Sequence, residues 1–354
     1  MAKTYYIGLM SGTSMDGVDG VVMDNRCENT KATAFLPYPP ELKTQLRQLA
    51  QRQTVSLKDL AQLDIAVAQL FAQTVTKLLK QKQISKNEIC AIGSHGQTIF
   101  HQGGVYSMQI GHGALIAEQT GITTVADFRM QDVAAGGQGA PLTPFYHRHL
   151  LAGKDGAIVN IGGIANITII KNKQTIGFDT GPANTLMDCW INKHKNLDYD
   201  KDGLWARSGS VNEALLTALL TDDYFHKLPP KSTGTEYFNL EWLAQYLSGN
   251  ERPEDVQRTL LELTVKSICA NIPTGDKVYL CGGGARNLLL TERLKQQAPT
   301  SKIALTDDLG VAADFVEAAA FALFAKQTTN SATANIPAVT GAQGERILGA
   351  IYQI

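Results

Sequence analysis

The first side chains suited to chemistry lie in one turn near the start of the chain, residues 12–19. Gly12 and Gly17 allow unusual backbone conformations and let a ligand approach closely, and successive backbone N–H groups in such a turn can bind an anion. Asp16 and Asp19 would repel a bare phosphate, but they suit a turn where Mg²⁺ accompanies phosphates. The turn therefore indicates nucleotide phosphates, with a polar surface turn as the alternative. The predicted contacts are Gly12, Thr13, Ser14, Met15, Asp16, Gly17, Val18 and Asp19.

Short apolar runs on both sides of this turn predict a β-hairpin. A similar pattern of strand, glycine turn and strand returns at residues 157–170, and a glycine turn at 282–284 leads from a strand into a helix. The repeated hairpins suggest a duplicated lobe, and a nucleotide in the cleft between two such lobes is their simplest use. The further predicted nucleotide contacts are Asn160, Gly162, Gly163, Gly282, Gly283, Gly284 and Asn287.

Polar residues follow the short apolar strand at 89–93. His95, Gln97 and Thr98 occur where α/β sheets place ligand contacts, at the carboxyl end of a strand. His95 and His101 lack partners at metal-ligand spacing, so we expect hydrogen bonds to a polar ligand instead of a protein metal site. The glycine-rich segment 126–141 reads as a loop that connects the lobes, with Arg129 either in an ion pair or binding a substrate carboxylate through its planar fork.

Two carboxylates further along the chain are candidates for the reaction itself. Asp179 follows a strand at 173–178 and precedes a helix that is predicted to begin near Pro182. It could act as a general base, or simply cap the turn. Glu317 lies in an alanine-rich helix at 312–325, where its side chain either faces solvent or is directed into the cleft.

Composition narrows the class of protein. The chain has 354 residues, enough for two domains, and a formal net charge of −1, which argues against nucleic-acid binding. Its 5 cysteines show no ligand spacing and suggest a reduced, cytoplasmic compartment. We see no signal peptide and no apolar run long enough to span a membrane. P-loop and dinucleotide-binding glycine patterns are missing from the sequence.

Five segments together resemble the anhydro-N-acetylmuramic acid kinase family, and the likeness extends from the first strand to Glu317. The segments are residues 8–19, 93–98, 126–129, 160–166 and 179–184. The resemblance implies an α/β, two-lobed, actin-like ATPase (ribonuclease H-like) fold with a central cleft between the lobes. It implies an ATP-dependent enzyme of bacterial cell-wall recycling that opens the anhydro ring with water and phosphorylates the 6-oxygen. Asp179 would be the base, and His95, Gln97, Thr98, Arg129, Asp179 and Glu317 would contact the sugar.

From these patterns and the resemblance we expect an N-terminal lobe of residues 1–130 and 340–354 and a C-terminal lobe of residues 131–339. The partners would be ATP and a small sugar, with Mg²⁺ held by the phosphates and reached by protein groups mainly through water; whether Asp16 or Asp19 touches it directly stays open. The resemblance also implies a homodimer. The alternatives are a non-catalytic nucleotide switch and a kinase for another amino sugar.

Overall fold

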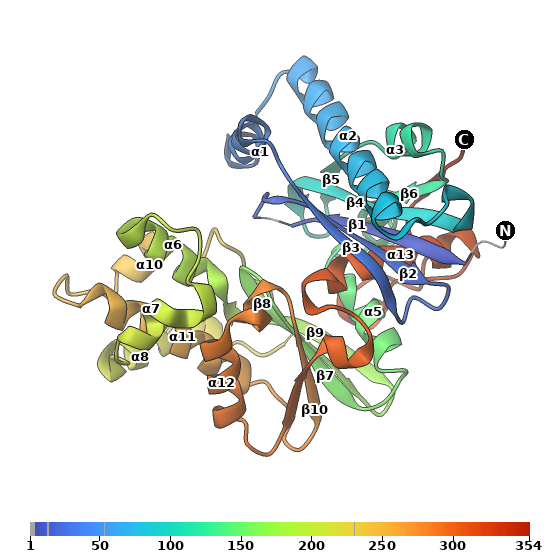
Figure 1. Cartoon of the computed structure of the whole chain (residues 1–354). Coiled ribbons are helices and arrows are strands. Elements are labelled where there is room, and N and C mark those ends of the chain that lie inside the picture. Colours follow the sequence, from blue (N-terminus) through green and yellow to red (C-terminus); the bar gives the residue numbers. More distant parts are fainter. Residues whose placement is uncertain (1–3, 13, 53, 230) are drawn as a thin grey trace. The chain divides into compact units, whose positions relative to one another are not determined.

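The computed structural model describes residues 4–12, 14–52, 54–229 and 231–354. The chain divides into two compact units, each built on its own β-sheet (Figure 1). Unit 1 comprises Met1–Leu150 and Leu309–Ile354, and unit 2 comprises Leu151–Asp308. The two-lobed α/β prediction is therefore confirmed at the level of two separate α/β units.

The sheet of unit 1 has seven strands. Its main path runs β12-β6-β4-β1-β2-β3, and β5 pairs with β4. The predicted hairpin is present as the antiparallel pair β1–β2, while β4 is parallel to β1 and β6 is parallel to β4. The strands are β1 (Tyr5–Ser11), β2 (Gly17–Asp24), β3 (Thr30–Pro37), β4 (Ile89–Gln102), β5 (Tyr106–Ile110), β6 (Thr124–Ala126) and β12 (Ala350–Tyr352).

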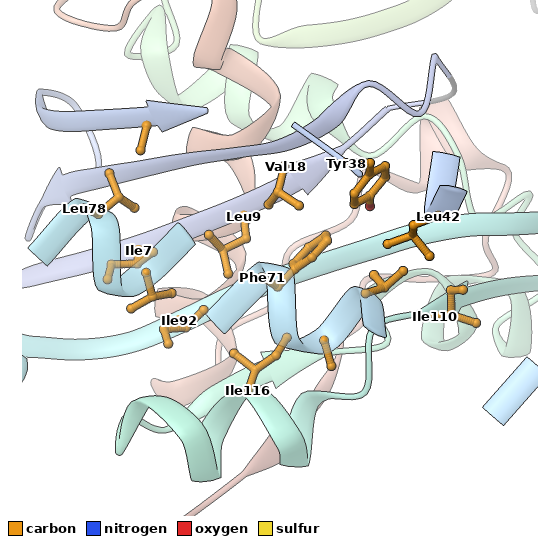
Figure 2. Close-up of a cluster of buried hydrophobic side chains, with 14 of the residues drawn as sticks. Ile7, Leu9, Val18, Tyr38, Leu42, Phe71, Leu78, Ile92, Ile110 and Ile116 are labelled. Carbon is orange, nitrogen blue, oxygen red and sulfur yellow. The ribbon is translucent and has the colours of Figure 1, made fainter. Parts of the chain in front are cut away.

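Helix α2 (Leu57–Lys82) covers one face of this sheet. Its apolar stripe packs on alternate strand residues, and Figure 2 shows Phe71 beside Leu9 with Ile7 and Ile92 in the same cluster. The other helices of unit 1 are α1 (Pro40–Arg52), η1 (Lys86–Glu88), α3 (Gly113–Thr120), α4 (Phe128–Ala134), α5 (Thr143–Leu150), η5 (Ala313–Phe315), α13 (Val316–Thr329) and α14 (Pro337–Thr340).

Helix α13 packs on the opposite face, against two strand glycines. A Cβ added to Gly8 would lie 1.8 Å from the main-chain oxygen of Ala318, and one added to Gly93 would lie 1.9 Å from that of Phe321. The absence of side chains at these two positions allows the helix backbone to approach the strands closely. This approach sets the position of Glu317, the residue before Ala318.

The sheet of unit 2 has five strands in the order β11-β10-β7-β8-β9. Its hairpin β7–β8 is antiparallel, and β10 runs parallel to β7, as β4 does to β1. The predicted duplication of the hairpin is thus confirmed. The strands are β7 (Gly156–Ile161), β8 (Ile164–Lys171), β9 (Gln174–Pro182), β10 (Lys277–Cys281) and β11 (Lys302–Leu305).

The helices of unit 2 follow β9 and β10. They are α6 (Asn184–Lys195), η2 (Lys201–Gly203), α7 (Leu204–Ser208), α8 (Glu213–Leu220), α9 (Asp223–His226), α10 (Leu240–Ala244), α11 (Pro253–Cys269), η3 (Gly283–Arg286) and α12 (Leu288–Gln297). The short η4 (Thr306–Leu309) crosses the boundary into unit 1. None of the described helices of either unit combines the length and the apolar character needed to cross a membrane.

The predicted lobe boundaries are wrong at both ends. Residues 131–150 and 309–339 belong to unit 1, because α5 and α13 pack together and α13 packs on β1 and β4. Segment 126–141 does not link the units, and it contains a helix, α4, instead of an open loop. Asp132 organises this segment: its buried carboxylate accepts hydrogen bonds from the Gly139 N–H, Asn335 and Thr340.

Candidate active site

A buried amide, the side chain of Gln97, makes hydrogen bonds at the β1–β2 turn of unit 1. The Gln97 side chain lies 2.7 Å from the Ser11 hydroxyl through Oε1 and donates from Nε2 to the Gly12 carbonyl, 3.3 Å away. A bulge in β4 sets up this arrangement: Leu9 pairs with Ser94 but Ser11 pairs with Gln97, and Gly96 in between has a φ of 74°. Gln97, which was predicted to contact sugar, therefore supports the turn.

Helix α1 brings two cations to the same turn. Lys43 Nζ lies 2.6 Å from Asp16 Oδ1, and Arg47 donates to the Ser14 carbonyl at 3.3 Å. Neither residue was predicted to belong to the site, although their spacing of i and i+4 places them on one helix face. Met15 and Val18 have buried side chains, Gly12 and Gly17 complete the turn, and Thr13 lies outside the described residues.

Asp19 on β2 lies among other carboxylates of unit 1. Burial and, to a smaller extent, the negative charges of Glu317, Asp314 and Asp16 together raise its pKa to about 7. Long-range packing thus gathers acids from the hairpin and from the start of α13. Such a cluster is costly to ionise without a cation nearby.

Arg129 on α4 is held by two neutral acceptors. Its Nε donates to His95 Nε2 at 2.9 Å, and its Nη1 donates to the Gly139 carbonyl at 2.8 Å. His95 lies 2.9 Å from the Gly96 carbonyl through Nδ1, and burial holds the pKa of this imidazole well below its ordinary value. His95 is therefore a neutral acceptor for Arg129. Neither of these two hydrogen bonds donated by Arg129 uses its Nη2.

Glu317 acts electrostatically on Arg129 as well as on Asp19. Burial lowers the pKa of Arg129, the negative charges of Glu317 and Asp132 partly oppose this shift, and the resulting pKa is about 10. The guanidinium therefore stays cationic at neutral pH. The structure therefore brings together three predicted site residues from separate segments of unit 1. Thr98, another predicted sugar contact, follows Gln97 in β4. Its hydroxyl accepts a hydrogen bond from Gln109 at 3.1 Å.

In unit 2, polar residues form a row across neighbouring strands. Cys281 pairs with Asn160, Asn160 with Asn166, and Asn166 with Asp179. Directly paired residues present their side chains to the same face of a sheet. The row therefore aligns the predicted residues Asn160 and Asp179 and adds Asn166, for which the sequence analysis proposed no role.

The glycine turns of unit 2 border this row. Gly162 and Gly163 accept backbone hydrogen bonds from the start of α6. Gly282 has a φ of 80°, and a Cβ there would lie 2.4 Å from Asn160 Oδ1. Gly284 is packed closely, whereas a Cβ on Gly283 would meet nothing within 4 Å. The Asn287 side chain, predicted to bind nucleotide, accepts from the Leu290 N–H and so caps α12.

Asp179 is fixed by groups from a distant loop and helix. Its Oδ2 accepts a hydrogen bond from the Thr233 N–H at 3.0 Å, and its main-chain oxygen accepts from the Tyr224 hydroxyl at 2.8 Å. The pKa of its carboxyl is raised to about 6, because burial, with a small contribution from the charge of Glu236, outweighs the opposing effect of the Thr233 hydrogen bond. A carboxyl with this pKa is ionised at neutral pH and is a better proton acceptor than an ordinary aspartate.

Comparisons with known proteins agree over nearly the whole chain. Residues 4–354 match the family model for anhydro-N-acetylmuramic acid kinase. This chain belongs to the anhydro-N-acetylmuramic acid kinase family. It is 48% identical to the family member from Nitrosomonas europaea, over 98% of this chain and 99% of that protein. It is 47% identical to the one from Coxiella burnetii strain Dugway 5J108-111, over 99% and 98% of the two chains.

A solved structure supports the fold of this anhydro-N-acetylmuramic acid kinase family member. The (R)-2-hydroxyglutaryl-CoA dehydratase component A of Acidaminococcus fermentans aligns with a TM-score of 0.50, over 92% of this chain and 99% of its own. The sequences are only 12% identical, so this likeness concerns the fold alone.

An acidic cluster of this kind suits a divalent cation such as Mg²⁺. Asp16 is paired with Lys43, whereas Asp19 is close enough to the other carboxylates for their charges to raise its pKa. Within the described parts of the chain no group of three or more His, Cys, Asp or Glu side chains could hold a metal ion.

We expect Asp19→Asn to stabilise the free protein at pH 8 by up to a few kcal/mol. The folded-state pKa of Asp19, about 7, lies above that of an unfolded aspartate, so ionisation weakens the folded state as pH rises from about 4 to 7. Urea unfolding at pH 5 and pH 8 should show the larger gain at pH 8.

Asp24 on the same strand is the matched control for Asp19→Asn. Hydrogen bonds from Asn29 and the Glu28 N–H outweigh desolvation and lower its pKa, so Asp24→Asn should destabilise the protein at pH 8. A loss of stability in Asp19→Asn at both pH values would contradict the proposed charge cluster.

We expect Thr233→Pro to move the acid limb of the kcat/KM profile to higher pH. Proline removes the N–H that stabilises ionised Asp179, so the pKa of the carboxyl should rise above about 6. Thr233→Ala keeps the N–H and should leave the profile in place. If both variants shift the profile equally, the side chain and not this hydrogen bond is responsible.

Proposed function

We propose that this protein is an ATP-dependent kinase that opens 1,6-anhydro-N-acetylmuramic acid with water and phosphorylates its 6-oxygen. The products are N-acetylmuramic acid 6-phosphate and ADP, and the reaction belongs to peptidoglycan recycling. The identity of the sugar rests on the family match over residues 4–354. The observation that carries the mechanism is Asp179, a desolvated carboxyl with a pKa of about 6 held by the Thr233 N–H.

In the proposed reaction, Asp179 takes a proton from a water molecule as the oxygen of that water attacks the anomeric carbon. The bond between that carbon and the 6-oxygen breaks, and the electron pair stays on the 6-oxygen. That oxygen attacks the γ-phosphorus of ATP, and ADP leaves. A positioned base of this kind contributes ~10²–10⁴ in rate, and positioning and charge stabilisation supply most of the remainder.

We assign the other predicted residues to binding. Arg129, oriented by His95 and Gly139, would bind the sugar carboxylate, and Glu317 and Thr98 would hydrogen-bond polar groups of the sugar. Residues 12–19 with Lys43 and Arg47 would bind the phosphates, and the glycine turns near Asn160 would take the rest of the nucleotide. Mg²⁺ would offset the negative charge of the transferred phosphoryl group when bound.

We also propose a cytoplasmic homodimer. None of the five cysteines takes part in a disulfide, which suits a reducing compartment. The dimer follows from the family resemblance alone. Size-exclusion chromatography with light scattering measures it directly, and a monomeric mass at micromolar concentration would reject this part of the proposal.

A coupled ADP-release assay with four sugars tests the function. The set is N-acetylmuramic acid and N-acetylglucosamine, each with and without the 1,6-anhydro bridge. Only the anhydro-muramic sugar should give rapid ADP release, because it combines the strained ring with the carboxylate assigned to Arg129. Equal rates with an ordinary sugar would identify a different amino-sugar kinase. ATP binding without turnover of any sugar would favour the nucleotide switch.

A further inference from the structure

A pocket of about 300 Å³ lies within unit 1. Apart from His95, none of the described residues assigned above to phosphate or sugar lines it. Its walls come from the start of α2, strands β4 and β5, the start of α3, the end of β6 and strand β12. Its lining includes Leu60, Asp64, Ser94, Met108, Ile110, Asp127 and Tyr352.

The pocket is on the α2 side of β4. Side chains alternate along a strand: Ile92 packs in the core under α2, Gly93 faces the backbone of α13, and Ser94 again faces α2. His95 points the other way, toward Phe321 of α13 and Arg129. The pocket is therefore separated by the strand from the groups assigned to the sugar.

Ser94 supplies an unused polar group in this pocket. The residue is fully buried, and its hydroxyl has no hydrogen-bond partner among the described residues. A buried hydroxyl without a partner costs free energy. A ligand that hydrogen-bonds to it would remove that cost.

The charged residues of the lining are both acids. Asp64 Oδ1 accepts from the Gly111 N–H at 2.6 Å, and Asp127 Oδ2 accepts from the Tyr352 hydroxyl at 2.9 Å. Each of these bonds uses one carboxylate oxygen. The pKa of Tyr352 is raised to about 12 by burial, by the hydrogen bond to Asp127 and by the charges of Asp127 and Asp64. The phenol therefore remains a neutral donor. Since both carboxylates affect this phenol, both lie near the same ring. In the part of the chain that the structure describes, no lysine or arginine lines the pocket to balance them.

We propose that this pocket binds a small organic ammonium ion through Ser94, Asp64 and Asp127. An ammonium group has three N–H donors and no acceptor, which matches a hydroxyl and two carboxylates. The apolar stem of the ligand would lie against Leu60, Met108 and Ile110, and the Tyr352 ring offers a cation–π surface. This inference concerns a second site and does not depend on the kinase reaction.

The probe is 1,5-diaminopentane, with 1,5-pentanediol as a neutral compound of the same length. Titration calorimetry of the full chain should give a Kd of about 1 mM or tighter for the diamine. The diol should bind at least about tenfold more weakly, because it lacks charge-assisted hydrogen bonds. The proposal would be overturned if the diamine gave no heat of binding at a concentration about tenfold above 1 mM. It would also be overturned if the diol bound as tightly as the diamine.

Three variants locate the binding. Asp127→Asn should weaken diamine binding about tenfold or more, because asparagine keeps the left-handed backbone of this residue (φ 60°) but loses the charge. Ser94→Ala should weaken binding about fivefold while leaving the Tm of the free protein unchanged or higher, since the lost hydroxyl had no partner. Glu118→Gln, exposed on α3 and outside the lining, is the control. Unchanged binding in both Asp127→Asn and Ser94→Ala would refute the site.

Discussion

Asp179→Asn should lower kcat by at least about 10²-fold, while the Kd for ATP changes little. Asparagine can still accept the hydrogen bond from the Thr233 N–H through its carbonyl oxygen, so the local geometry is kept, but it cannot take a proton from water. Steady-state kinetics by ADP release and calorimetric titration of nucleotide measure the two quantities separately.

The pH profile gives a second readout for Asp179. In the unsubstituted protein, activity should fall as pH drops through about 6, because protonation of the carboxyl removes the base. The residual activity of Asp179→Asn should lack this acid limb. Asp198→Asn, an exposed aspartate of the same unit, is the matched control and should retain both rate and profile. Near-normal turnover in Asp179→Asn would remove this residue from the role of base.

Gly8→Ala should destabilise unit 1 by about 1–3 kcal/mol or more. The added Cβ would lie 1.8 Å from the Ala318 oxygen and 2.8 Å from the Ala322 nitrogen, so the backbone of α13 would have to move away from β1. Backbone atoms of a packed helix cannot turn aside as a flexible side chain can. Urea unfolding followed by circular dichroism measures the loss.

Gly12→Ala is the matched control for Gly8→Ala, since nothing lies within 4 Å of a Cβ there. It should leave the stability of the nucleotide-free protein nearly unchanged. The displaced α13 should also shift Glu317, so any Gly8→Ala protein that folds should have a raised KM for the sugar. A Gly8→Ala protein as stable as the Gly12→Ala protein would contradict the close approach of α13.

Local patterns were enough to predict the elements that frame the candidate site. The β1–β2 and β7–β8 hairpins appear where the apolar runs around the glycine turns place them. These patterns depend on residues close together in the sequence, so they can be recognised without knowledge of the tertiary fold. The family was also evident from the sequence, because its motifs are short contiguous segments.

Other features depend on contacts between distant segments. The lobe boundaries were wrong because α13 packs on strands more than two hundred residues earlier in the chain, which no local pattern records. The Thr233 N–H that binds Asp179 is a backbone group, and a backbone group has no signature in the sequence. Gln97 was predicted to be a ligand contact, and only the bulge at Gly96 shows that it supports the Gly12 turn.

The sequence by itself thus determined the two hairpins, the residue types available for chemistry and the family to which they belong. The tertiary structure decided which of those residues act on one another, as Glu317 does on both Asp19 and Arg129. It also decided that Asp179 has a pKa near neutrality. The physical reason is that electrostatic interaction and desolvation depend on distance and burial in space, whereas periodicity and motif spacing depend only on order along the chain.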